Sequence, residues 1–121
     1  MVAKRTRRKI DPELALRILR TVPMPNAFLF FTDEGQYTGK SASSLADFLE
    51  KLNKIPLKSL EFHFGRRDFE KWVEGTLSDE YLADRITKIE RTIQGENIRK
   101  TLQKTVKNRL NQLKTAQKTK T

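Results

Sequence analysis

Basic side chains between residues 99 and 114 have the types and the spacing that suit chemistry with an anion: Arg99, Lys100, Lys104, Lys107, Arg109 and Lys114. Three of them, Lys100, Lys104 and Lys107, recur at intervals of four and three residues, which places them on one face of a helix. An apolar stripe is available to dock the opposite face: Ile98, Leu102, Val106 and Leu113. We predict a basic amphipathic helix over residues 95–114 whose cations contact phosphates. A merely solvated helix face is the competing interpretation.

The same chemistry recurs at both ends of the chain: Lys4, Arg5, Arg7, Arg8 and Lys9 near the start, and Lys118 and Lys120 near the finish. Residues 1–20 and 91–121 carry net charges of +5 and +8, whereas residues 21–90 carry −3. A charge that only kept the protein in solution would have no reason to segregate in this way. We therefore expect the basic ends to contact a polyanion, and nucleic acid is the one we favour.

The segment from Gly35 to Ser41 has the glycines, lysine and serine of a phosphate-binding loop. Three residues separate Gly35 from Gly39, whereas a Walker loop has four, so the spacing argues against nucleotide hydrolysis. Lys40 and Ser41 precede an expected helix, whose free amides can accept an anion. They are a possible anion site, and the alternative is that the serines only cap the helix.

Catalytic and metal-binding chemistry has few candidates. The chain has no cysteine and one histidine, which excludes thiol catalysis, disulfides and zinc sites built on thiolates or several histidines. His63 lies near Glu61, Asp68 and Glu70, and we expect it to hydrogen-bond locally rather than complete a site. We predict no enzyme, no cofactor and no metal site.

Membrane association is disfavoured by the same composition. No window approaches eighteen apolar residues, and the basic start lacks the apolar stretch of a secretory signal. Residues 96–114 contain no Trp or Phe to insert into a bilayer. We expect a cytoplasmic protein without a membrane partner.

The elements that position these side chains follow from the apolar pattern of a chain long enough for one domain. Asp11 and Pro12 predict a helix start, and the aromatic run over residues 27–32 predicts a buried strand before a turn at 33–35. A helix follows over 41–53, with Ser41, Ser43 or Ser44 available as its cap. Alternating Leu60, Phe62 and Phe64 predict a second strand over 58–64, parallel to the first because a helix would connect them.

The remaining segments are predicted to be helical. Residues 67–76 bury Phe69, Trp72 and Val73, and Trp72 is expected in the core. Ser78, Asp79 and Glu80 begin a helix with a narrow apolar seam formed by Leu82, Ile86, Ile89 and Ile93. Gly95 interrupts it. The predicted fold is a single α+β domain, mostly helical, with a flexible basic arm (1–10), a compact body (11–94), the basic helix (95–114) and a polar basic tail (115–121).

The middle of the chain resembles a known family. The resemblance rests on three motifs: the run from Tyr37 through Gly39 and Leu45 to Phe48, the run from Ser59 to His63, and Asp68, Phe69, Trp72 and Val73 followed by Leu82 to Arg85. These are similar to small prokaryotic domains, frequent in archaea, that have no assigned function. The resemblance spans roughly residues 27–90. It implies a shared fold around Phe48, Phe69 and Trp72, assigns no catalytic residue, and leaves function to the basic ends.

We predict a nucleic-acid-binding protein that contacts structured RNA, as a ribosome-associated or ribosomal protein, through its basic ends. Long basic extensions on a compact body suit folded RNA, and no zinc finger, helix-turn-helix or RNP motif supports sequence readout. The alternative is a protein-interaction adaptor or dimerising scaffold that uses the Leu82–Ile93 seam. DNA or chromatin association is third, and an enzyme acting on an anionic substrate would need a pocket around a perturbed carboxylate or His63.

Overall fold

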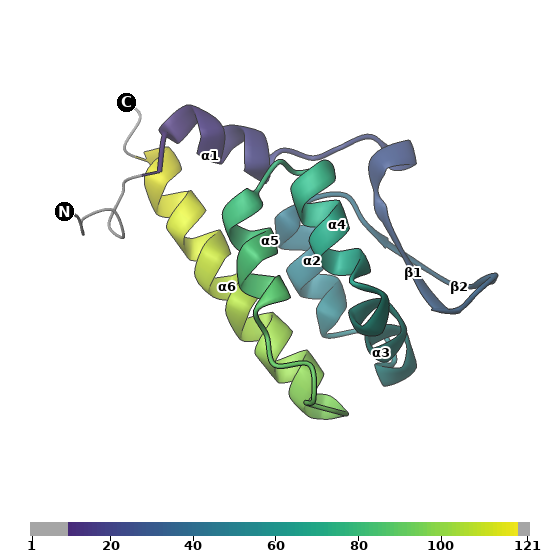
Figure 1. The fold of residues 1–121 in the computed structure, drawn as a ribbon. Helices are drawn as coiled ribbons and strands as arrows, with labels where there is room; N and C mark the ends of the chain where they lie inside the picture. Colours follow the sequence, from purple (N-terminus) through teal and green to yellow (C-terminus); the bar gives the residue numbers. More distant parts are fainter. Residues whose placement is uncertain (1–9, 119–121) are drawn as a thin grey trace.

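The computed structural model describes residues 10–118 as six α-helices, one short 3-10 helix and a β-hairpin (Figure 1). The elements are α1 (Pro12–Leu19), η2 (Met24–Asn26), β1 (Phe28–Asp33), β2 (Gln36–Ala42), α2 (Leu45–Leu52), α3 (Leu57–Arg66), α4 (Asp68–Gly75), α5 (Glu80–Thr87) and α6 (Glu96–Lys118). The predicted class, a mostly helical α+β domain with a small two-stranded sheet, is confirmed.

The sheet is an antiparallel hairpin, so the predicted parallel pairing was wrong. β1 pairs with β2 from Phe28 opposite Ala42 to Asp33 opposite Gln36. Gly35 occupies the tight turn between them with a φ of 74°, a conformation that glycine adopts without the steric cost of a side chain. The partner of β1 is therefore the strand that follows it directly.

Residues 57–66 form α3, although the sequence predicted a strand over 58–64. Leu60, His63 and Phe64 are buried in this helix, whereas Phe62 is only half-buried. Leu57, Leu60 and Phe64 are spaced by three and four residues, which is the period of a helix. The same segment therefore fits both a helix and an alternating strand. The change of element also turns His63 from an expected polar face into the core.

Three helices begin where a side chain caps their free amides. Asp11 accepts a hydrogen bond from the amide of Glu13, Ser44 from Asp47, and Asp79 from Leu82. The caps of α1 and α5 agree with the sequence prediction, and Ser44 is one of the three serines predicted as possible caps of α2. Helix α2 begins at Leu45 rather than at residue 41, because residues 36–42 continue the hairpin.

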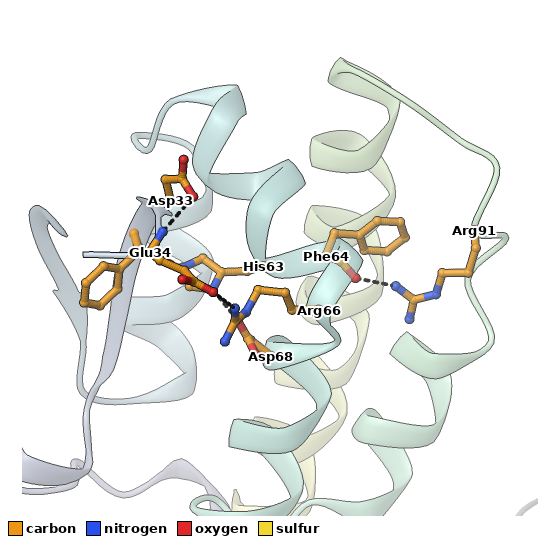
Figure 2. Close-up of polar contacts among 8 residues, drawn as sticks. Asp33, Glu34, His63, Phe64, Arg66, Asp68 and Arg91 are labelled. Atoms are coloured by element: carbon orange, nitrogen blue, oxygen red, sulfur yellow. Dashed lines mark hydrogen bonds and ion pairs between the residues drawn. The ribbon is translucent and has the colours of Figure 1, made fainter. Parts of the chain in front are cut away.

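Helix α5 ends at Thr87, so the predicted seam is not one helix face. Leu82 and Ile86 are fully buried in the core, and Ile89 and Ile93 pack against it from the linker between α5 and α6. Arg91 fixes this linker by donating from Nη1 to the carbonyl of Phe64, at 2.8 Å (Figure 2). Leu82 and Ile86 therefore lie inside the core, while Ile89 and Ile93 are half-buried in the linker, and the four do not form one helix face for a partner.

The core lies between the hairpin and the helices and is rich in aromatic rings. Phe30, Phe48 and Phe69 are fully buried. Trp72 is 8% exposed and its indole N–H donates to the carbonyl of Asn26 at 2.8 Å, which confirms its predicted place in the core. Figure 1 shows α6 on one side of the domain and the hairpin on the far side.

Candidate nucleic-acid interface

Helix α6 has one buried and one exposed face along 23 residues. The predicted apolar stripe is buried, together with Leu110: Ile98, Leu102, Val106, Leu110 and Leu113. This stripe packs against α1, α2, α3 and α5, so the helix is fixed along the body of the domain. Neither α6 nor any other helix within residues 10–118 is long and apolar enough to cross a membrane.

Five lysines lie on the opposite face of α6, at intervals of four, three, seven and four residues: Lys100, Lys104, Lys107, Lys114 and Lys118. We name these five residues the lysine stripe. All five are exposed. None forms an ion pair with a carboxylate of the described residues, although Glu96 lies close enough to Lys100 for the charge of that lysine to lower the pKa of the Glu96 carboxyl. The helix extends four residues beyond its predicted end, which adds Lys118 as a fixed member of the stripe.

Arg99 was predicted to bind nucleic acid with these lysines, but it faces the body. Its Nη1 donates to the carbonyls of Leu52 and Ile55, both at 2.8 Å, where α2 ends. Its Nε donates to Glu96 at 2.7 Å, and this hydrogen bond holds the pKa of the Glu96 carboxyl below its usual value. Arg99 therefore caps α2 and attaches the start of α6 to it.

Arg109 was also predicted to contact nucleic acid and is instead buried. Its Nε and Nη2 donate to the two carboxylate oxygens of Asp79, each at 2.9 Å. Arg109 is 6% exposed and Asp79 is 1% exposed. Because the pair is closed to solvent and doubly hydrogen-bonded, Arg109 is an internal link between α6 and α5 and does not reach a ligand.

The other predicted cations are distributed as follows. Lys4, Arg5, Arg7, Arg8, Lys9 and Lys120 lie outside the described residues. Lys40 and Ser41 lie within β2, not at a helix N-terminus, so the possible anion site predicted there is not formed. The N-terminus of α2 is already capped by Ser44 and by Asp47, which accepts from the amide of Ser43.

Asp47 remains ionised in this cap. Burial favours its neutral form, but the hydrogen bonds from Lys51 and from the Ser43 amide outweigh burial and lower the pKa of the carboxyl. The start of α2 therefore already holds a negative group, which disfavours a second anion there.

A groove of about 310 Å³ runs between α5 and α6, next to the lysine stripe. Tyr81 is 49% exposed, and its ring lies 4.6 Å from the guanidinium carbon of Arg109 and 6.0 Å from that of Arg85. The α6 side of the groove presents the amides of Asn108, Asn111 and Gln112. Asn111 lies four residues after Lys107 and three before Lys114, so the groove opens directly at the stripe.

A second cavity, of about 430 Å³, lies between the hairpin and α3, with His63 at its inner wall (Figure 2). The Nε2 atom of His63 accepts from the amide of Phe31 at 2.8 Å, and Nδ1 lies 2.8 Å from Asp68 Oδ2. This pairing requires a neutral ring with its proton on Nδ1. Burial lowers the pKa of His63, which also favours the neutral form, although Asp68 opposes the shift.

These two hydrogen bonds make His63 a structural connection between β1, α3 and the start of α4. The expectation that it hydrogen-bonds within the protein is confirmed. Arg66 extends the cluster toward the hairpin, with Nε 3.0 Å from Asp68 and Nη1 3.8 Å from Glu34 (Figure 2). Within residues 10–118 no three histidine or acidic side chains are placed to hold a metal ion.

Most of the chain matches one known protein family. A family model described as "Family of unknown function (DUF5752)" matches residues 25–121. The chain belongs to this family. The family region continues past residue 90, where the resemblance seen in the sequence ended, so the lysine stripe and the α5–α6 groove lie within the family domain. Neither a curated protein nor a solved structure matches the chain.

The sequence did not single out Tyr81, Arg85 or Asn108 as functional residues. A signal was present in the four-residue spacing of Tyr81 and Arg85, which places both on one side of α5. Only the packing of α5 against α6 brings them to Asn108, which is 23 or more residues away in the chain. The groove is therefore a feature of the family domain that tertiary structure, not local pattern, creates.

Proposed function

We propose that this protein binds nucleic acid through the lysine stripe of α6, with structured RNA preferred over duplex DNA. The observation that carries the proposal is the separation of cations on this one helix. Arg99 and Arg109 bind groups in the body of the domain, while the five lysines share an exposed face and form no ion pair with a described carboxylate. Cations with a structural role would form ion pairs within the protein, as Arg99 and Arg109 do.

The dimensions of the stripe suit a phosphate backbone. From Lys100 to Lys118 the helix rises about 27 Å at about 1.5 Å per residue. One strand of duplex DNA carries about eight phosphates over this length, at about 3.4 Å each. Every lysine can therefore contact a different phosphate, and each contact releases condensed counterions. Helix α6 holds the cations in place before binding, which lowers the entropic cost of association.

Structured RNA and a ribosome-associated or ribosomal role are the specific forms of this proposal that we favour. A folded RNA brings phosphates from several strands close together, and a rigid row of cations lowers their mutual repulsion. Residues 10–118 contain no zinc-binding cluster of the kind used for base readout in DNA. The seam predicted for an adaptor function is divided between the core and the linker after α5 and forms no single helix face, so the exposed surface supports nucleic-acid binding better than it supports that alternative.

A charge-reversal series tests the proposal. The stripe variant carries Lys100→Glu, Lys104→Glu and Lys107→Glu. The matched control carries Lys40→Glu, Lys58→Glu and Lys71→Glu, three exposed lysines on β2, α3 and α4 that form no ion pair with a described carboxylate. Both variants have the same net charge. Each is titrated with a structured RNA and with duplex DNA at one salt concentration, after its melting temperature has been compared with that of the parent.

The stripe variant is expected to lose about tenfold or more in affinity for both nucleic acids, and the control much less, because only the stripe contacts phosphates. The parent is expected to bind the RNA more tightly than the duplex DNA. Equal losses in the two variants would show that net charge, not the stripe, determines binding. A folded stripe variant that binds as the parent does would overturn the proposal.

A further inference from the structure

We propose that the α5–α6 groove binds one unpaired nucleotide, whose base stacks on Tyr81 and whose edge meets the side-chain amides of Asn108 and Gln112. The inference rests on the proposed function, since the lysine stripe would hold the strand whose base enters the groove. It adds a ligand class to that function: a single-stranded or looped segment, not a continuous duplex.

Tyr81 has the surroundings of a stacking platform. About half of the residue is exposed, and Tyr81 is one of the residues that line the groove. The guanidinium carbon of Arg109 lies 4.6 Å from the ring centroid, in direct contact with the ring, while that of the exposed Arg85 is farther away, at 6.0 Å. Arg109 is itself held by the buried bidentate pair with Asp79. Any base can stack on such a ring, because every base has a π-face.

The polar lining matches the edge of a base. The side chain of Asn108 forms no hydrogen bond with another described residue, so both its donor and its acceptor are available. Gln112 accepts from Arg109 Nη1 at 3.3 Å through its oxygen, which leaves its NH₂ group to donate. A volume of about 310 Å³ is at the small end of ligand sites and is of the size needed for a single base.

The groove also lies where a bound strand would pass. Asn111 belongs to the groove lining and stands in the helical register of the lysine stripe, between Lys107 and Lys114. A backbone bound along the stripe therefore runs past the mouth of the groove. Bases of a duplex are stacked inside it and must be extruded at a cost before they can enter, whereas bases of a loop are free.

The test compares Tyr81→Leu with Tyr81→Phe in the full chain. Tyr81→Leu removes the aromatic face and keeps apolar bulk, while Tyr81→Phe keeps the face. Three probes of about 12 nucleotides are used: a single-stranded RNA, an abasic strand with the same phosphates, and a duplex. We expect Tyr81→Leu to bind the single-stranded RNA about 5- to 150-fold more weakly than the parent. Affinity for the other two probes should stay unchanged, and Tyr81→Phe should match the parent throughout.

Asn108→Ala is a second variant that leaves Tyr81 in place, and it should weaken only the binding of the single-stranded RNA. The groove inference is wrong if Tyr81→Leu and Asn108→Ala both bind that RNA as the parent does. It is also wrong if Tyr81→Leu loses affinity for all three probes equally, since a stacking contact cannot act on an abasic strand. Parent-like binding by the stripe variant would refute the proposed function instead, so the two failures are distinguishable.

Discussion

Arg109 and Asp79 form a buried, doubly hydrogen-bonded ion pair that joins the middle of α6 to the N-terminus of α5. Asp79 uses the same carboxylate to accept from the amide of Leu82 and so caps α5. One side chain therefore fixes the helix boundary, the contact between two helices and the position of a cation beneath Tyr81. This relationship separates the cations of α6 that hold the domain together from those that face solvent.

Removal of Arg109 should destabilise the domain strongly. Arg109→Ala leaves the carboxylate of Asp79 buried without its partner, and the loss of one partner of a buried pair costs about 3 to 5 kcal/mol. Urea unfolding of the variant measures this loss. Lys107→Ala, on the same helix but exposed, is the control and should change the free energy of unfolding by less than about 0.5 kcal/mol. Similar values for the two variants would contradict the buried role of Arg109.

The stability of the protein should fall as the pH drops below about 6.5. His63 has a pKa below its ordinary value of 6.5 in the folded state, mainly because of burial. Just below that pH the unfolded chain binds a proton that the folded chain does not, so protonation favours unfolding. The contribution of His63 is complete above its unfolded pKa and is lost as the pH falls toward its folded pKa.

Urea unfolding at several pH values between about 8 and 5.5 measures this dependence, since His63 is the only histidine in the chain. His63→Gln should remove most of the pH dependence in this range. It should also lower stability at every pH, because the ring no longer accepts the amide of Phe31. A parent protein whose stability is constant across the range, or rises as the pH falls, would contradict the neutral, buried ring.

Trp72 should contribute to stability and not to binding. Trp72→Ala removes a large buried ring that contacts Phe28 and Phe48, and we expect a loss of about 3 to 5 kcal/mol. Trp72→Phe keeps most of the apolar volume and should cost less. Thermal unfolding gives the order of the three proteins, and a nucleic-acid titration of Trp72→Phe should match the parent. Stable Trp72→Ala protein with lost binding would instead indicate a surface stacking role.

Much of the helical architecture could be predicted from local patterns. Asp11 and Asp79 identified the helices that they cap, and the aromatic run of β1 identified a strand. β2 was missed because most of its residues are exposed and it has no apolar alternation. Segment 57–66 was ambiguous, since its apolar residues satisfy both a strand period and a helix period. In the structure β2 is the strand that pairs with β1, so residues 57–66 are not required as its partner.

The residues of the candidate interface also fall into two groups, those that the sequence predicts and those that only the folded structure reveals. The spacing of Lys100, Lys104 and Lys107 predicted their shared exposed face, because helical period alone determines it. Arg99 and Arg109 have the same charge, and apart from Glu96 three residues before Arg99 nothing local marks them as structural. The contacts that join them to the body are with the carbonyls of Leu52 and Ile55 and the carboxylate of Asp79, all at least 30 residues away. Tertiary contacts, not composition, decide which cations are free.

The salt dependence of binding tests the lysine stripe most directly, because its slope counts the phosphates that the protein neutralises. The affinity of the parent and of the stripe variant for one single-stranded RNA is measured across a range of salt concentrations. If each of the five lysines contacts a phosphate, a plot of log K against log salt should have a slope of about −3.5 or steeper for the parent. The stripe variant should be shallower by about 2. A slope near zero for the parent, or the same slope in both proteins, would contradict binding through the lysine stripe.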